Sequence, residues 1–172
     1  MDGLARVAFA GGRLPLSAVC LLDTSIFCEI LAVPNMHADA AGHIRKLRAR
    51  VEAGETLLLP MTAILETGNH IGHHGAGAAR RAAAERFVEQ VTRAVNGSAP
   101  FAPSRFWTPE VLVEWLAAFP NWAARVDPKG KGSGLGDLSL VEEWKFACEL
   151  FPRPRVYIWS LDAHLSSYDR AV

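Results

Sequence analysis

The sequence predicts an α/β protein with a central, mostly parallel sheet between two layers of helices, that is, a three-layer α/β/α sandwich. Runs of four or five consecutive apolar residues, typical of strands buried on both faces, stand at residues 18–22, 56–59 and 156–159. Segments with helical spacing or composition separate these runs. Short buried strands that alternate with helices indicate parallel strands joined through helices.

Each element follows from local signals. The apolar run at 18–22 ends abruptly at Asp23, and a helix is expected from 26 to 32, before Pro34. Further helices are expected over residues 39–53, 61–71, 78–95, 109–119 and 138–150, with a terminal helix after Asp162. A short strand is expected at 106–107. In the helix 61–71, Leu65 is expected to point inward.

A length of 172 residues suits one domain with a substantial core. Residues 1–17 are weakly patterned and are expected to form an N-terminal extension, with one added strand at 6–9. Residues 18–172 are expected to form a single domain. Residues 127–136 (DPKGKGSGLG) hold four glycines and are expected to be a flexible loop.

The composition favours a cytoplasmic protein. The N-terminus lacks a signal-peptide pattern, and no apolar run approaches the roughly 20 residues that span a bilayer, so no membrane partner is expected. The cysteines are odd in number and show no CxxC spacing, which argues against zinc and disulfides. Basic and acidic residues balance at 18 each, so contacts with phosphate groups would depend on local patches or bound cations.

Four acidic residues stand at positions where functional groups gather in such folds. Asp23 and Asp162 directly follow strands, Asp137 closes the glycine-rich loop, and Glu66 lies about one and a half turns into its helix. Each aspartate could equally be only a helix N-cap. Glu66 differs, because a glutamate inside a helix caps nothing, and the residue four positions later is not Lys or Arg.

The segments around these acids resemble the four acidic motifs of PIN domains, known widely as VapC-type toxin nucleases. They read LLDTS at 21–25, MTAILETG around Glu66, GLGDLSL around Asp137 and SLDAHL around Asp162. Their order and approximate spacing match, over roughly residues 18–168. The chain departs from the family in its greater length, in the stretch 101–126, and in Leu165, where an aromatic residue is frequent.

The resemblance implies a PIN-like fold and a catalytic, metal-binding pocket. Asp23 and Asp162 would be the central ligands, completed by Asp137 and Glu66. Clustered carboxylates repel one another, and a divalent cation relieves that repulsion. Oxygen ligands favour Mg²⁺ or Mn²⁺, which could activate a water for attack on a phosphodiester. Ser25 is expected to hydrogen-bond substrate phosphate or a ligand acid, or else to cap its helix.

Other polar and aromatic residues are weaker candidates. Lys129 and Lys131, in the glycine-rich loop, are expected to contact substrate phosphates. A basic helix face is interpreted as solvated surface; it carries Arg45, Lys46, Arg48 and Arg50. Three histidines are interpreted as surface or substrate-facing rather than zinc ligands, namely His70, His73 and His74. Five tryptophans are expected in the core or an interface rather than as platforms for bases: Trp107, Trp115, Trp122, Trp144 and Trp159.

The leading hypothesis is an Mg²⁺- or Mn²⁺-dependent endoribonuclease that hydrolyses RNA, as the toxin of a toxin–antitoxin pair. Its expected partners are RNA, a small antitoxin protein and a second copy of the chain in a homodimer. The alternative is a catalytically silent PIN-like binding or scaffold module, against which the four retained acids argue. Phosphotransfer of the haloacid-dehalogenase type needs an aspartate two residues after Asp23, where Ser25 stands.

Overall fold

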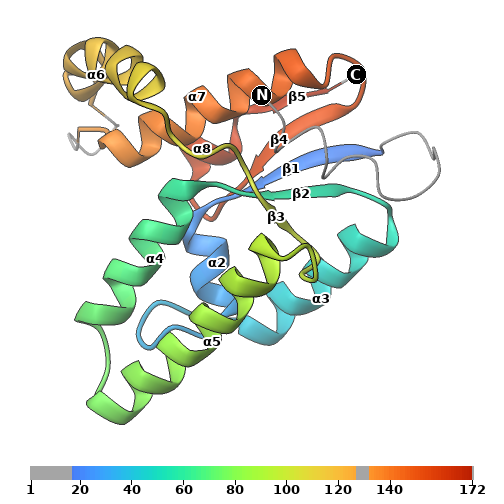
Figure 1. Cartoon of the computed structure of the whole chain (residues 1–172), viewed down its shortest axis with the longest axis vertical. Coiled ribbons are helices and arrows are strands. Elements are labelled where there is room, and N and C mark those ends of the chain that lie inside the picture. Colours follow the sequence, from blue (N-terminus) through green and yellow to red (C-terminus); the bar gives the residue numbers. More distant parts are fainter. Residues whose placement is uncertain (1–16, 127–131, 172) are drawn as a thin grey trace.

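The computed structural model describes residues 17–126 and 132–171, in which strands and helices alternate through most of the chain (Figure 1). The strands are β1 (Ala18–Leu22), β2 (Thr56–Leu59), β3 (Ala102–Pro103), β4 (Arg155–Trp159) and β5 (Asp169–Arg170). The helices are α2 (Thr24–Ile30), α3 (Ala40–Glu52), α4 (Met61–His73), α5 (Gly77–Val95), α6 (Pro109–Ala123), α7 (Leu135–Leu150) and α8 (Ala163–Ser166).

The strands form one mixed, mostly parallel sheet in the order β3-β2-β1-β4-β5. β1 lies in the centre and pairs in parallel with β2 on one side and β4 on the other. β3 extends the parallel part, and β5 closes the other edge by antiparallel pairing with β4. The α/β class and the mostly parallel sheet are therefore confirmed. Parallel pairing places the carboxyl ends of β1, β2 and β4 side by side, and we call this side of the sheet its carboxyl edge. Asp23 and Ser160 directly follow β1 and β4 there.

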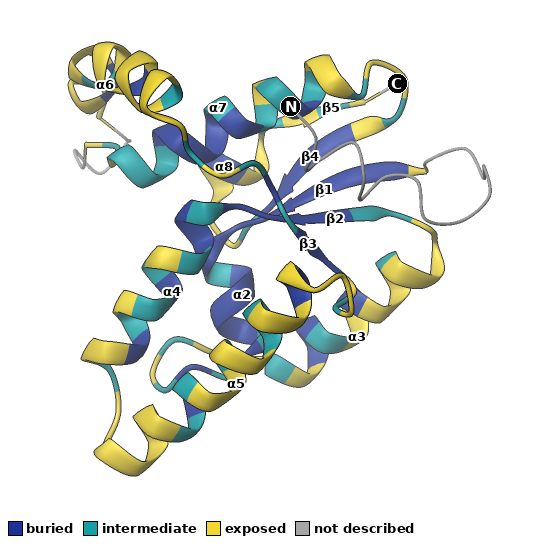
Figure 2. Ribbon diagram, in the orientation of Figure 1, coloured by how far each residue is buried: buried dark blue, intermediate teal, exposed yellow. Residues whose placement is uncertain are grey.

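Both faces of the sheet are buried, so side chains that alternate along a strand enter two different cores (Figure 2). Cys20 and Leu22 of β1 join an apolar cluster with residues of α2, α3, α4 and α5. Val19 and Leu21 join a second cluster with residues of α6, α7 and α8. This two-sided burial explains why β1 is apolar at every position.

Most element boundaries agree with the sequence prediction, and the exceptions have local causes. The strand expected at 106–107 is wrong: the residues that pair with β2 are Ala102–Pro103, and Phe106 is exposed. α6 runs past Pro120 to Ala123, and its last turn buries Trp122. α7 begins at Leu135, three residues earlier than expected, although the added turn contains Gly136, a poor helix former. Leu65 is 54% exposed rather than inward.

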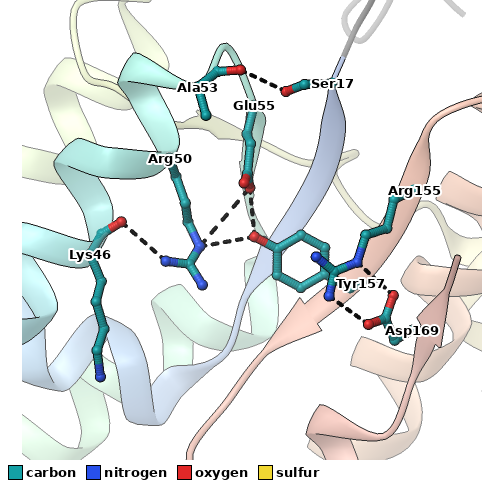
Figure 3. A network of polar contacts seen from close by, with 8 residues as sticks. All are labelled: Ser17, Lys46, Arg50, Ala53, Glu55, Arg155, Tyr157 and Asp169. Atoms are coloured by element: carbon teal, nitrogen blue, oxygen red, sulfur yellow. Dashed lines mark hydrogen bonds and ion pairs between the residues drawn. The ribbon is translucent and has the colours of Figure 1, made fainter.

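A polar network fastens the opposite edge of the sheet, where the parallel strands begin (Figure 3). The Tyr157 hydroxyl donates to a Glu55 carboxylate oxygen at 2.5 Å and accepts from the Arg50 Nε at 2.9 Å. Arg155 pairs through two nitrogens with Asp169 of β5, at 2.9 and 2.6 Å. Arg50 is thus not part of a purely solvated face, because it is committed to this network and stacks on Trp159 at 3.8 Å.

Three further expectations concern membrane helices, the cysteines and the N-terminal extension. Within residues 17–126 and 132–171, no helix is long and apolar enough to cross a membrane. Cys20, Cys28 and Cys148 are all free, and burial raises the pKa of each thiol. The expected N-terminal extension at 1–17 falls, except for Ser17, outside the described residues, as does its strand at 6–9.

Candidate active site

Asp23 begins the candidate site, at the end of β1 and the start of α2. Asp23 is 8% exposed, and its carboxylate caps α2, because Oδ2 accepts from the Ser25 backbone N–H at 3.3 Å. The same oxygen accepts from the hydroxyls of Ser25 at 2.6 Å and Ser160 at 2.7 Å. The expected cap is therefore real, but two serine hydroxyls from different elements also converge on this acid.

Those serines join the loop after β4 to the start of α2. The Ser25 hydroxyl, which donates to Asp23, accepts from the backbone N–H of Leu161 at 3.0 Å. The Ser160 hydroxyl likewise accepts from the backbone N–H of Asp162 at 2.9 Å. Ser25 thus contacts a site acid, as expected, and holds the loop that carries Asp162. Ser160 was missed, although it stands inside the SLDAHL segment, because nothing in the sequence shows which acid it contacts.

Glu66 lies opposite Asp23, in the second turn of α4. Its Oε2 accepts from the hydroxyl of the buried Thr24 at 2.7 Å. Its other oxygen faces the first turn of α7, where a Cβ built on Gly136 would lie only 2.0 Å from Oε1. Any larger residue at position 136 would therefore displace this carboxyl group from its position. Neither Thr24 nor Gly136 was singled out from the sequence, although both adjoin aspartates that were.

The electrostatics of Glu66 show that three of the four acids share one region. Burial raises the pKa of the Glu66 carboxyl, and the charges of Asp23 and Asp137 raise it further. The Thr24 hydrogen bond and, more weakly, His70 act in the opposite direction. α4 contacts both α2 and α7, so the starts of three helices bring these acids together at the carboxyl edge of the sheet (Figure 1).

Asp137 occupies a different position from the one expected. It does not open α7 but is the third residue of the helix, and its Oδ2 accepts from the backbone N–H of Gly134 at 3.2 Å. A carboxylate in the first turn is favoured by the partial positive charge of the helix N-terminus. The N-cap residue of α7 is thus Gly134 and not Asp137, but the Asp137 carboxylate still caps the helix start, which agrees with the structural alternative.

Asp162 is the acid that the structure does not bring into the group. It caps α8 and is exposed, and its Oδ1 accepts from the backbone N–H groups of His164 at 2.7 Å and Leu165 at 3.2 Å. Among residues 17–126 and 132–171, Asp162 is connected to the site through its backbone N–H, which donates to the Ser160 hydroxyl. In the part of the chain that the structure describes, no three His, Cys, Asp or Glu side chains stand as a ready metal-binding group.

The remaining candidates are placed as follows. Lys129 and Lys131 lie outside the described residues. His70 is one turn beyond Glu66, its ring centroid 5.8 Å from that of His74, while His73 Nδ1 lies 2.7 Å from the Asn69 carbonyl oxygen. Trp115, Trp122 and Trp159 are buried as expected. Trp107 is only half-buried and lines an open pocket beside Glu66.

The donor chemistry of the site fits a hard divalent cation. Asp23, Glu66 and Asp137 offer carboxylate oxygens, the ligands preferred by Mg²⁺ and Mn²⁺. Burial is the main cause of the raised pKa of Glu66, and the charges of Asp23 and Asp137 add to it; a bound cation would relieve that added repulsion. Comparison of the chain with protein-family models and with curated proteins finds no match.

Proposed function

We propose that this chain is an Mg²⁺- or Mn²⁺-dependent endoribonuclease with a PIN-like, three-layer α/β/α fold. The observation that carries the proposal is the convergence of Asp23, Glu66 and Asp137 from three helix starts at the carboxyl edge of a parallel sheet. Each acid alone has a structural explanation. Their shared position, together with a half-buried glutamate that caps nothing, is better explained by a ligand.

Asp23, Glu66 and Asp137 would hold the cation, and Asp162 would join them by a turn of its side chain away from the α8 cap. When bound, such an ion supplies a water of lowered pKa and neutralises charge on the leaving oxygen. The chain's own residues prepare its ligands: the Ser25 and Ser160 hydroxyls orient Asp23, and the Thr24 hydroxyl orients Glu66. The Thr24 hydrogen bond lowers the pKa of Glu66 and so favours the ionised carboxylate that a cation requires.

The biological context of the proposal is a toxin–antitoxin pair in the cytoplasm. It depends on the resemblance of the four acidic segments to VapC-type toxins. A small antitoxin protein would then cover the site, and the chain would act as a homodimer. Expression without the antitoxin should arrest growth, whereas expression of the Asp23→Asn variant should not. Growth arrest by both forms would contradict the link between nuclease and toxin.

One observation favours the alternative, a catalytically silent binding or scaffold module. The Asp162 carboxylate is engaged as a helix cap, so the fourth acid of the site faces its own helix. The two functions differ in what a cation does. An active site gains stability and hydrolyses RNA when Mn²⁺ is added, whereas a silent module does neither.

A matched pair of variants tests the nuclease. Asp23→Asn removes the charge at the centre of the site, and Asp39→Asn removes the same charge from the N-cap of α3. Asparagine caps a helix about as well as aspartate, so both variants should fold. Purified wild type and Asp39→Asn should cleave single-stranded RNA with Mn²⁺ or Mg²⁺, and Asp23→Asn should not. Full activity of Asp23→Asn, or cleavage by wild type in EDTA, would refute the proposal.

A further inference from the structure

An open pocket of about 170 Å³ adjoins the Glu66 carboxyl group. It is formed between α4, the start of α7 and the segment that joins β3 to α6. Its lining residues are Thr62, Leu65, Glu66, Trp107, Leu135, Gly136 and Ser139. Two of them, Glu66 and Gly136, belong to the candidate active site, so a molecule bound at the acids would reach directly into the pocket.

Trp107 forms an aromatic wall of this pocket and is held in place from two sides. Its Nε1 donates to Oε1 of Glu143 on α7, at 3.3 Å. Its ring meets that of the buried Trp115 edge to face, with centroids 5.5 Å apart and planes at 80°. A large ring that is fixed in this way and remains half-buried offers a ready surface for another planar group.

Glu143 is an unusual partner, because it is only 3% exposed. Burial raises the pKa of its carboxyl, and the nearby Ser104 hydroxyl, the Trp107 hydrogen bond and the nearby Arg105 charge oppose this rise. Arg105 in turn stacks on the Phe146 ring at 4.1 Å. A buried acid is costly unless its partners are fixed, so this cluster orders the segment that carries Trp107.

The face of α7 that carries Glu143 also builds the pocket. Gly136, Ser139 and Glu143 follow one another at spacings of three and four, which places them on one side of the helix. Gly136 and Ser139 line the pocket, and Glu143 anchors its wall. One helix therefore connects the Glu66 carboxyl to the position of the Trp107 ring.

The lining of the pocket suits a flat, uncharged group rather than a phosphate. Two apolar side chains line the pocket, Leu65, which is 54% exposed, and Leu135. Among the described residues that line the pocket, Glu66 is the one with an ionisable side chain, and none is Lys or Arg. In a nucleic acid, the uncharged planar part is the base.

We infer that this pocket binds one unpaired base of the RNA substrate, stacked on Trp107, while the neighbouring phosphodiester lies at the acids. The inference rests on the proposed nuclease function and specifies its substrate as single-stranded RNA. A base within a duplex is stacked and paired and cannot enter a side pocket. Aromatic stacking binds single strands with little dependence on sequence.

Binding rather than cleavage tests this inference. A short fluorescein-labelled single-stranded RNA is titrated with protein in the Asp23→Asn background, so that it is not cut, and its anisotropy is followed. Adding Trp107→Ala should weaken binding by roughly 5- to 150-fold, the range for one stacked base. Trp107→Phe should retain most of the affinity. Phe106→Ala, which removes a neighbouring aromatic ring that is 60% exposed but does not line the pocket, should change little.

A second measurement covers the case in which Trp107→Ala does not fold. RNA should quench the tryptophan fluorescence of the Asp23→Asn protein, which is the parent of these variants. Most of that quenching should be absent when Trp107→Phe is added. An RNA with abasic sites should bind the parent as weakly as intact RNA binds Trp107→Ala. Equal binding by all variants, equal binding of duplex RNA, or no RNA binding would overturn the inference. Trp107-dependent binding by a wild type that cleaves nothing would uphold it while refuting the nuclease.

Discussion

Gly136 touches Glu66 so closely that adding one methyl group should disable the site without unfolding the protein. A Cβ at position 136 would lie 2.0 Å from the Glu66 Oε1, 3.0 Å from Cδ and 3.3 Å from the Thr62 Cγ2. Carbon atoms pack best at about 3.5–4.0 Å, so the carboxyl group would have to move by roughly 1 Å or more. Because it ends a flexible side chain, it can do so while the backbone stays in place.

The expected magnitudes follow from the contacts that change. Moving the carboxyl group breaks the Thr24–Glu66 hydrogen bond, and a bond to a charged group contributes about 1.5–3 kcal/mol. Replacing glycine by alanine within a helix raises the free energy of unfolding by about 1 kcal/mol. Gly136→Ala should therefore lower the free energy of unfolding by about 0.5–2 kcal/mol. Displacing a catalytic group by about 1 Å can cost on the order of 100-fold in rate.

The assay compares Gly136→Ala with Gly72→Ala in α4, where a new Cβ would have no neighbour within 4 Å. Urea denaturation measures stability, and the initial rate on single-stranded RNA with Mn²⁺ measures activity. Gly72→Ala should be at least as stable as wild type and fully active. If Gly136→Ala matched Gly72→Ala in both respects, the packing of Glu66 against α7 would not be required for the reaction.

Two further predictions concern stability. The raised pKa of Glu66 means that the folded state binds this proton more tightly than the unfolded chain, so the free energy of unfolding should fall as pH rises from the ordinary carboxyl range to the raised pKa. Urea denaturation across pH should show a smaller decline for Glu66→Gln, and an unchanged decline would contradict this account. Arg170 donates to three carbonyl oxygens at and beyond the end of α7. Arg170→Met should lower the free energy of unfolding, measured by thermal denaturation, by about 2–4 kcal/mol while RNA cleavage is retained. A decrease below about 1 kcal/mol would show that these hydrogen bonds do not stabilise the end of α7.

The central strands could be predicted from sequence because burial on both faces leaves a clear pattern. β1, β2 and β4 are runs of apolar residues, and alternate side chains enter the two cores. The edge strands β3 and β5 have two residues each and leave no such pattern. They are defined by pairing with the backbone groups of β2 and β4, and not by a pattern in their own residues. For the same reason, the strand expected from the aromatic pair at 106–107 was wrong.

The site could be predicted in outline and not in its contacts. Strand ends located Asp23, and the interior position of Glu66 singled it out. The start of α7 could not be predicted, because Gly136 is a poor helix former and tertiary packing overrides that preference. The direction of the Asp162 side chain could not be predicted either, since capping α8 and binding a ligand require the same residue type at the same position.

A second glutamate provides a comparison that supports the proposed cation site at Glu66. Glu29 is also buried inside the chain, 2% exposed, and its two oxygens accept backbone N–H groups from Ala38 at 2.8 Å and Asp39 at 3.0 Å. His43 lies beside it, with Nδ1 3.5 Å from Oε2. A structural acid in this protein is thus surrounded by donors. Glu66 accepts one hydroxyl among the described residues and lies near two further acids. Glu66 lacks such a surrounding of donors in the described part of the chain, and the proposed cation would supply the missing counter-charge.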